Sequence, residues 1–308
     1  MLLEKTRPSI ETIERNGKVG ETKQSPKQSD EFMITRGREF VVRHRRGADI
    51  NELMRLVLDF SRGRGEVIKA GRKTRLAFFE TKTGEVLIKG YERLSFLNRV
   101  GALLGWSRGH KSWRASLGLA VRGIETPQAL ALVVKKRHFF PEKVYFVSRS
   151  TRPLLELDRF ILRHKNAPDL LDRLVYELAE SVGGLHRNGI YHGDLKSMNI
   201  VIGKGEDGGM MLSFLDLDRV LFLKRVSVRR RAKNLSQLFI TLPIAIDARR
   251  RREFLSIYLR SMGERGSGDK IIARTGEILR GRMIHHVGLD GQDIYEDTSA
   301  LFNDIFGR

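Results

Sequence analysis

The chain has 308 residues, 41% of them hydrophobic and 31% charged, so it can bury a substantial core and is not globally disordered. It contains no cysteine, which excludes disulfides, thiolate zinc sites and cysteine nucleophiles. The formal net charge of +20 favours a polyanionic partner, such as nucleic acid, anionic lipid or a phosphorylated substrate. No apolar run approaches the roughly 20 residues of a membrane-spanning helix, so we expect a cytoplasmic protein.

The N-terminal segment, residues 1–34, is predicted to be a flexible tail. It is rich in Lys, Glu, Gln, Ser and Gly, and its scattered apolar residues cannot offset the entropy lost on ordering. After Arg36 the composition changes, and residues 51–60 place apolar side chains at helical spacing. A folded region is therefore expected from residue 35, with a short helix near its start.

Residues 35–148 are predicted to form a small, mainly antiparallel β lobe. Runs rich in β-branched and aromatic residues alternate there with turn-like sequences, which is typical of consecutive antiparallel strands. A turn is expected at Pro141. The strand-like runs are residues 65–81, 84–91, 129–136 and 143–149, and the runs with helical spacing are 96–106 and 112–123.

Residues 149–308 are predicted to form a mainly helical lobe. Its first helix, residues 169–189, carries one apolar stripe and ends at Gly189. Pro243 should end or kink a later helix. The other expected elements are a hairpin made by residues 199–203 and 210–216, and helices over 234–246 and 252–262. The region after about Gly263 is expected either to pack on this lobe or to bind a partner.

The segment YHGDLKSMNIVI and the aspartate that follows one hairpin later contain the candidate catalytic and metal-binding residues. Phosphoryl transfer needs metal ligands, charge neutralisation and a carboxylate that receives the proton of the acceptor hydroxyl. Asp194 is the candidate for that carboxylate, and Lys196 is placed to neutralise the transferring phosphoryl group. Asn199 and Asp216 are the candidate ligands of Mg²⁺. The alternative, a polar turn capped locally by Asp194, leaves the spacing of these residues unexplained.

This segment resembles the catalytic loop of the eukaryotic-like kinase superfamily, H-x-D-L-K-x-x-N, whose metal aspartate follows one hairpin later. The resemblance implies an α+β, protein-kinase-like two-lobe fold that uses ATP and Mg²⁺. It also implies a strand lysine that holds the α- and β-phosphates of ATP, and Lys89 occupies that place. The turn that covers the phosphates would contain Lys69 and Gly71, although it lacks the G-x-G-x-x-G pattern.

Two features argue against a peptide substrate. No A-P-E element follows Asp216, and Gly193 stands where phosphoregulated protein kinases have an arginine. Within the superfamily, the chain resembles the lipopolysaccharide core kinases, which phosphorylate heptose or 3-deoxy-D-manno-octulosonic acid (Kdo). The similar pieces are VLIKGY, the stretch from Ser107 to Leu130, YHGDLKSMNIVI and FLDLDRV, in which Asp216-Leu217-Asp218 replaces D-F-G. Asp218 is either a second acid or a local structural partner.

The chain departs from this family at two positions. Ser112 stands where the family has a glutamate that pairs with the strand lysine, and Glu92 is a candidate substitute. Asn234 stands where a later helix often carries aspartate, and its amide oxygen can still accept a hydrogen bond.

The resemblance implies a sugar or glycolipid acceptor from the lipopolysaccharide core, and a cytoplasmic protein, peripheral at the inner face of the inner membrane. Basic clusters at residues 229–231 and 249–252 would attract an anionic membrane surface or form a solvated face. No specific nucleic-acid binding is expected, and the sequence does not define the oligomeric state. The alternatives are a compact atypical protein serine/threonine kinase and a non-catalytic kinase-like protein that binds nucleotide.

Overall fold

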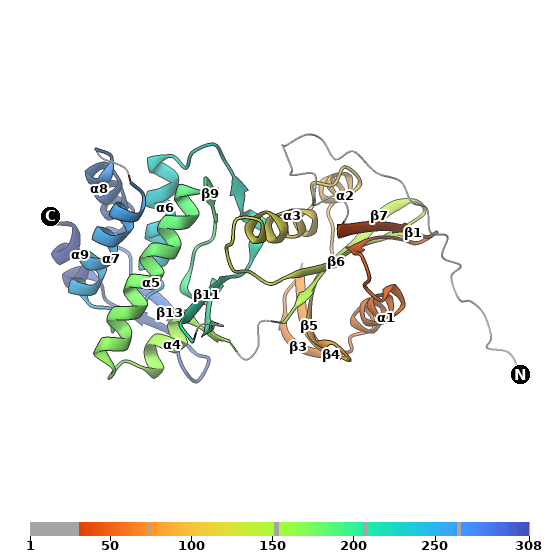
Figure 1. Ribbon diagram of the computed structural model, residues 1–308, viewed down its shortest axis with the longest axis horizontal. Coiled ribbons are helices and arrows are strands. Elements are labelled where there is room, and N and C mark those ends of the chain that lie inside the picture. The colour runs from red at the N-terminus through yellow and green to blue at the C-terminus, as the bar shows by residue number, and fades with distance from the viewer. Residues whose placement is uncertain (1–30, 73, 151–153, 206–207, 264–265, 308) are drawn as a thin grey trace, which may run out of the picture. The chain divides into compact units, whose positions relative to one another are not determined.

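The computed structural model describes residues 31–72, 74–150, 154–205, 208–263 and 266–307. These residues divide into two compact units. Unit 1 comprises the described residues up to Leu117 together with Pro127–Ser150, and unit 2 comprises Gly118–Thr126 and the described residues from 154 onward. Unit 1 is built on an antiparallel sheet and unit 2 is mostly helical (Figure 1), which confirms the predicted α+β fold class.

Within the described part of unit 1, seven strands form one antiparallel sheet in the order β1-β2-β6-β7-β5-β4-β3. The strands are β1 (Phe32–Arg36), β2 (Phe40–Arg45), β3 (Glu66–Ala70), β4 (Thr74–Thr81), β5 (Gly84–Tyr91), β6 (Ala129–Arg137) and β7 (Phe140–Arg149). The helices that accompany them are α1 (Ile50–Ser61), α2 (Phe96–Leu103) and α3 (Arg108–Ala120). The helical and strand-like runs expected before residue 150 therefore form these elements.

Both faces of this sheet are buried, and β6 shows how the sequence achieves this. Ala131 and Val133 join a core that includes the apolar stripe of α1. Leu132 and Val134 point to the opposite face and join a second core with Trp113 of α3. This alternation with period two is what an extended strand requires when both of its faces are covered.

Two expectations for unit 1 need correction. Strand β1 begins at Phe32, so residues 32–34 belong to the sheet and not to the tail, because Met33 and Ile34 pair with β2. The rest of the predicted tail, residues 1–30, lies outside the described residues. The turn between β6 and β7 lies at His138 and Phe139, which both have positive φ, whereas Pro141 is inside β7.

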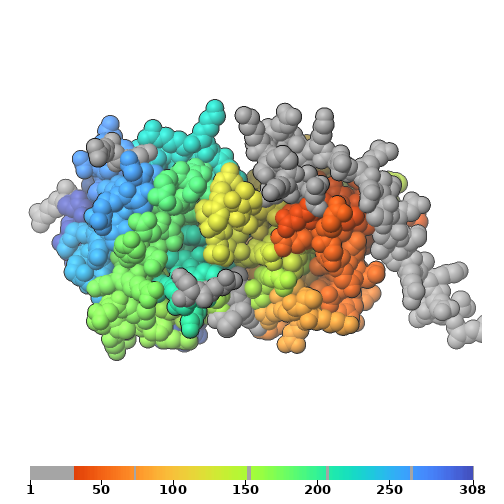
Figure 2. All heavy atoms as spheres, in the orientation of Figure 1, coloured from red at the N-terminus to blue at the C-terminus, as the bar shows by residue number. Residues whose placement is uncertain are grey.

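Unit 2 contains the predicted helices and the predicted hairpin. Its helices are α4 (Leu157–Arg163), α5 (Pro168–Arg187), α6 (Val228–Phe239), α7 (Ala248–Ser261), α8 (Gly268–Leu279) and α9 (Ser299–Phe306). Its short strands are β8 (Leu155–Glu156), β9 (Ile190–Tyr191), β10 (Ile200–Lys204), β11 (Met210–Phe214), β12 (Leu221–Phe222), β13 (Ile284–Val287) and β14 (Asp293–Glu296). Helix α6 ends before Pro243, as expected. In Figure 2 the blue side chains of α7 adjoin the green side chains of α5.

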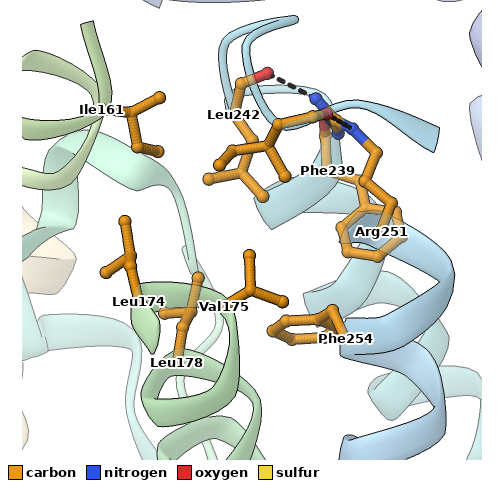
Figure 3. Close-up of a pocket in the computed structure, with 9 residues that line it drawn as sticks. Ile161, Leu174, Val175, Leu178, Phe239, Leu242, Arg251 and Phe254 are labelled. Carbon is orange, nitrogen blue, oxygen red and sulfur yellow. Dashed lines mark hydrogen bonds between the residues drawn. The ribbon is translucent and has the colours of Figure 1, made fainter. Parts of the chain in front are cut away.

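Arg251 is a structural element of the unit 2 core. Its guanidinium is fully buried and donates hydrogen bonds to four backbone carbonyls, those of Phe239, Leu242, Pro243 and Ile246. Figure 3 shows Arg251 beside Phe239 and Leu242. Burial lowers the pKa of Arg251 to about 9. The apolar cavity beside it has a volume of only about 10 Å³, which is too small for a ligand.

The predicted basic clusters are mostly engaged within unit 2. Arg249 and Arg250 both bind the Asp172 carboxylate, at 2.7 and 2.6 Å, and Arg252 pairs with Asp304 at 2.9 Å. Arg231 in the other cluster is buried. The two interpretations of these clusters, a lipid-binding surface and a solvated face, therefore apply to only some of their arginines.

The C-terminal region, for which the sequence left two possibilities, packs on unit 2. Helix α8 contacts α6, and α9 contacts α7. The backbone amide of Ile244 donates to Glu296 at 2.8 Å, and that of Val287 donates to Asp158 at 3.1 Å. Across the described ranges, every helix is too short or too polar to cross a membrane.

Candidate active site

The candidate catalytic loop follows α5 in unit 2. Helix α5 ends at Arg187, and Gly189 then adopts the left-handed conformation that often ends a helix. Gly193, directly before Asp194, also has positive φ, and a Cβ atom there would lie 2.6 Å from the carbonyl oxygen of Arg219. Close backbone approach therefore gives a physical reason for glycine at position 193.

The structure brings Asp194, Lys196 and Asn199 together. The ammonium nitrogen of Lys196 lies 3.5 Å from Oδ1 of Asp194. The side-chain nitrogen of Asn199 donates to the backbone carbonyl of Asp194 at 2.9 Å. Because this bond uses the amide nitrogen, the amide oxygen of Asn199 is the atom able to ligate a cation.

Asp216 is held beside this loop by β10 and β11. Ile200 pairs with Phe214 in that hairpin, and the amide of Leu215 donates to the Asn199 carbonyl at 2.8 Å. Asp216 itself has a left-handed backbone with φ of 54° and ψ of 58°. Such a conformation is uncommon for a residue other than glycine, although aspartate tolerates it better than most, and it is concentrated at functional sites.

His192 connects the loop to the segment that carries Asp216. Its Nε2 lies 2.9 Å from the carbonyl oxygen of Leu215, so a neutral ring with the proton on Nε2 fits this contact. Burial lowers the pKa of His192, although the hydrogen bond to Leu215 and the carboxylates of Asp216 and Asp194 oppose that effect. A buried neutral imidazole of this kind positions its neighbours and is not placed to act as the base.

Helix α6 supplies a set of polar side chains that hold the loop backbone. Asn234 Oδ1 lies 3.3 Å from the amide nitrogen of His192, and Gln237 bonds both the amide of Leu195 and the carbonyl of Gly193. The Thr241 hydroxyl, just beyond the helix, accepts from the Ser197 amide at 2.9 Å.

The sequence interpretation missed Gln237 and Thr241. Their signal is their spacing from Asn234, three and seven positions, which places their polar groups on the same face of α6 and of the turn that follows it. Asn234 was identified, and its amide oxygen accepts hydrogen bonds as expected, from the His192 amide and from Nε2 of His186 at 3.1 Å.

The remaining candidate residues lie in unit 1. Lys89 is on β5, on the same face as Tyr91, and its ammonium nitrogen is 5.7 Å from the centre of the Tyr91 ring. Lys69 is exposed on β3, and Gly71 lies in the turn between β3 and β4, where its amide donates to Thr74 at 2.9 Å. That is the position expected of a phosphate-covering turn.

Ser112 has taken a different role from the glutamate that the family carries. It is buried on α3, and its hydroxyl oxygen lies 3.1 Å from the hydroxyl of Tyr91. Glu92, the candidate substitute, instead pairs with Arg75 at 3.0 Å. Tyr91 is thus a residue near Lys89 that the sequence interpretation did not single out.

The residues present are suited to Mg²⁺ bound together with a nucleotide. Mg²⁺ prefers oxygen ligands and is commonly held by one or two protein groups plus substrate phosphates. Asn199 and Asp216 supply an amide oxygen and a carboxylate. Over the described ranges, no group of three or more His, Asp or Glu side chains could hold a metal ion by itself.

The model of the "Lipopolysaccharide kinase (Kdo/WaaP) family" matches residues 59–258. The chain belongs to this family. The matched range contains Lys89, the loop from His192 to Asn199, and Asp216. The family resemblance inferred from the motifs is therefore confirmed, and membership of a family of lipopolysaccharide kinases supports the predicted class of enzyme.

A solved structure of WaaP in complex with acyl carrier protein has a similar fold. Its TM-score is 0.52 at 22% sequence identity, and the match covers 77% of this chain and 88% of that chain. Serine/threonine-protein kinase ksp1 of Schizosaccharomyces pombe is 33% identical over 73 residues, which are 22% of this chain and 15% of that protein. The match to this curated relative thus spans only a small part of its length.

Proposed function

We propose that the protein is an ATP-dependent kinase that phosphorylates a sugar hydroxyl, on heptose or Kdo, of the lipopolysaccharide inner core. The observation that carries this proposal is the grouping of Asp194, Lys196 and Asn199 in one loop, hydrogen-bonded to the segment of Asp216. These are the parts that phosphoryl transfer requires. The family assignment supports the acceptor class.

In this mechanism, the Asp194 carboxylate orients the acceptor hydroxyl and receives its proton. Lys196, 3.5 Å away, offsets the negative charge of the transferring phosphoryl group. Mg²⁺ held by Asn199 and Asp216 would neutralise charge on the phosphate oxygens. Lys89 is proposed to contact the α- and β-phosphates of ATP, with Lys69 and Gly71 in the turn that covers them.

The short segment after Asp216 favours a small acceptor over a peptide. Helix α6 already begins at Val228, and the residues between contain the turn η3 (Leu217–Arg219) and strand β12, which pairs with β9. A protein kinase forms its peptide platform from this part of the chain. The similarity to ksp1 nevertheless makes a protein acceptor the alternative to test.

The acceptor class also implies a location. An enzyme that acts on lipopolysaccharide core before export would work in the cytoplasm, peripheral to the inner face of the inner membrane. The net charge of +20 would favour approach to an anionic surface.

The decisive experiment is ATP consumption by the purified protein with Mg²⁺, measured with deacylated lipopolysaccharide core, with a generic serine/threonine peptide and with neither. Turnover stimulated by core and absent in Asp194→Ala is the expected result. Stimulation by the peptide alone would replace the sugar acceptor by a protein. Nucleotide binding without turnover under all three conditions would favour the non-catalytic alternative.

A further inference from the structure

Helix α2 has an unusual distribution of side chains. Of its residues only Ala102 is buried, while Phe96, Leu97 and Leu103 are exposed. A short helix on a folded domain normally directs its large apolar side chains inward. Here the small residues face unit 1 and the large ones face solvent, so burial in this unit does not explain the composition of the helix.

The exposed side chains continue beyond the helix. Leu104 and Trp106 follow α2, and Trp106 is 63% exposed. Phe139 at the tip of the β6–β7 turn is 83% exposed, and the neighbouring Phe140 stacks on Phe96 with ring centres 6.5 Å apart. Figure 1 shows α2 at the margin of unit 1. The apolar patch comprises Phe96, Leu97, Leu103, Leu104, Trp106 and Phe139.

Phe139 occupies a backbone conformation that phenylalanine rarely adopts. Its φ is 67° and that of His138 is 49°, in a two-residue hairpin turn that favours asparagine and glycine. A phenylalanine there gains no burial and occupies a strained backbone region. The position therefore fits a contact made outside unit 1.

The charged residues that lie close to α2 along the chain are mostly of one sign. From Arg93 to Ile124 the chain has basic residues and no Asp or Glu. Exposed cations close to α2 in sequence are Arg93, Arg99, Arg108 and Lys111, and Arg137 precedes the β6–β7 turn. An anionic partner is therefore complementary to the rim, whereas a second copy of this chain would bring two positive surfaces together.

We infer that the apolar patch docks on an anionic lipid bilayer, with its apolar side chains in the interface and its basic rim on the headgroups. Protruding apolar side chains with an exposed tryptophan and adjacent arginines are suited to the boundary between headgroups and acyl chains. Large exposed patches of this kind mark interaction sites. The inference concerns a surface separate from the catalytic loop, and its test needs no phosphoryl transfer, so it can fail while the proposed function holds.

The first test is co-sedimentation of the full chain with vesicles of phosphatidylglycerol and phosphatidylethanolamine, compared with phosphatidylcholine alone. We expect binding to the anionic vesicles, and the double variant Leu97→Ser/Leu104→Ser to weaken it at least about tenfold. The matched control is Met283→Ser/Leu289→Ser, which removes two exposed apolar side chains of unit 2. The control should bind as the unchanged chain does.

The electrostatic part of vesicle binding and the insertion of Trp106 into the bilayer can be measured separately. Arg93→Gln/Arg99→Gln should weaken binding at low salt and make the further loss of binding with added salt shallower, whereas Arg229→Gln/Arg230→Gln should change both little. The chain has two tryptophans, and Trp113 is buried, so a vesicle-induced blue shift reports mainly on Trp106 and should vanish in Trp106→Phe.

Four results would overturn the inference. The chain could fail to bind anionic vesicles, or both double serine variants could lose binding equally. Acrylamide could fail to quench Trp106 fluorescence in the absence of vesicles, which would mean that another part of this chain or a second copy covers the patch. An acidic protein as the true partner would leave vesicle binding of Leu97→Ser/Leu104→Ser unchanged.

Discussion

In the candidate catalytic loop of unit 2, backbone groups of Gly193, Leu195 and Ser197 are hydrogen-bonded to side chains of α6 or the residues that follow it. In unit 1, the ammonium nitrogen of Lys89 lies 5.7 Å from the centre of the Tyr91 ring, and the Tyr91 hydroxyl lies 3.1 Å from that of Ser112. Polar networks with matched donors and acceptors fix a geometry strongly, whereas a cation near a ring tolerates displacement.

The difference predicts where substitutions should act. The loop should tolerate little change, because its residues are proposed to touch the reacting atoms and its backbone is fixed by specific hydrogen bonds. Lys89 should tolerate more, because its proposed role is to hold phosphates that do not react. The predictions below begin with the largest expected effect.

Asp194→Asn should reduce kcat by about a thousandfold, because the amide cannot receive the acceptor proton at neutral pH. The affinity for Mg²⁺-ATP should stay nearly unchanged, since Asp194 is not a proposed metal ligand. Steady-state kinetics and equilibrium nucleotide binding measure the two effects. Asp269→Asn, at an exposed position of α8, is the matched control. Unchanged kcat in Asp194→Asn would refute the role of Asp194.

Gln237→Ala should reduce kcat by about one hundredfold through misplacement of the loop. Its side chain bonds Gly193 and Leu195, on either side of Asp194, so both contacts would be lost. Ser236→Ala is the control on the same helix, because its hydroxyl bonds Ala232 and does not contact the loop.

Thermal unfolding should show a similar modest loss of stability in both of these variants, about 1 to 3 kcal/mol. A fall in kcat that is equal for the two variants would show that α6 contributes only stability.

How far the sequence predicts the site depends on how local each contact is. Asp194, Lys196, Asn199 and the strand-turn-strand before Asp216 lie within one short stretch, and hydrogen bonds of the described structure connect the loop to that hairpin. Their proposed roles were inferred from spacing and remain to be tested. Gln237 could not be inferred in this way, because its contact with the loop depends on how α6 packs against it.

The fold was predictable where apolar periodicity is strong. Helix α5 and strand β6 follow their apolar patterns closely. Strand β1 was missed because its short apolar run continues directly from a long polar segment, and only pairing with β2 identifies it. The bonding of Arg251 was equally unpredictable, since a run of arginines normally indicates a solvated face, whereas this side chain turns back onto carbonyls at the end of α6 and in the segment between α6 and α7.

The protein should become less stable as the pH is lowered, because of His186. Burial lowers its pKa to about 4 in the folded state, against 6.5 ordinarily. Between these two pKa values the unfolded chain binds more protons than the folded chain. The contribution of His186 to the free energy of unfolding is therefore present above about pH 6.5 and is lost as the pH falls towards 4.

Melting temperatures between pH 4 and 7 test this, with His186→Gln as the comparison. The variant should be less stable at pH 7, because His186 bonds both Tyr258 and Asn234, and it should show a shallower decline with acid. An equal slope in both proteins would assign the acid sensitivity to other groups, among them buried His110, whose pKa is also lowered to about 4.

The smallest effect tests whether Tyr91 positions Lys89. If the ring holds the ammonium group, Tyr91→Phe should leave the KM for ATP nearly unchanged, whereas Tyr91→Leu should raise it by about threefold. If instead the hydroxyl matters, through its contact with Ser112, then Tyr91→Phe and Ser112→Ala should share one phenotype. Equal KM values in all three variants would mean that Tyr91 and Ser112 act only in packing and do not position Lys89.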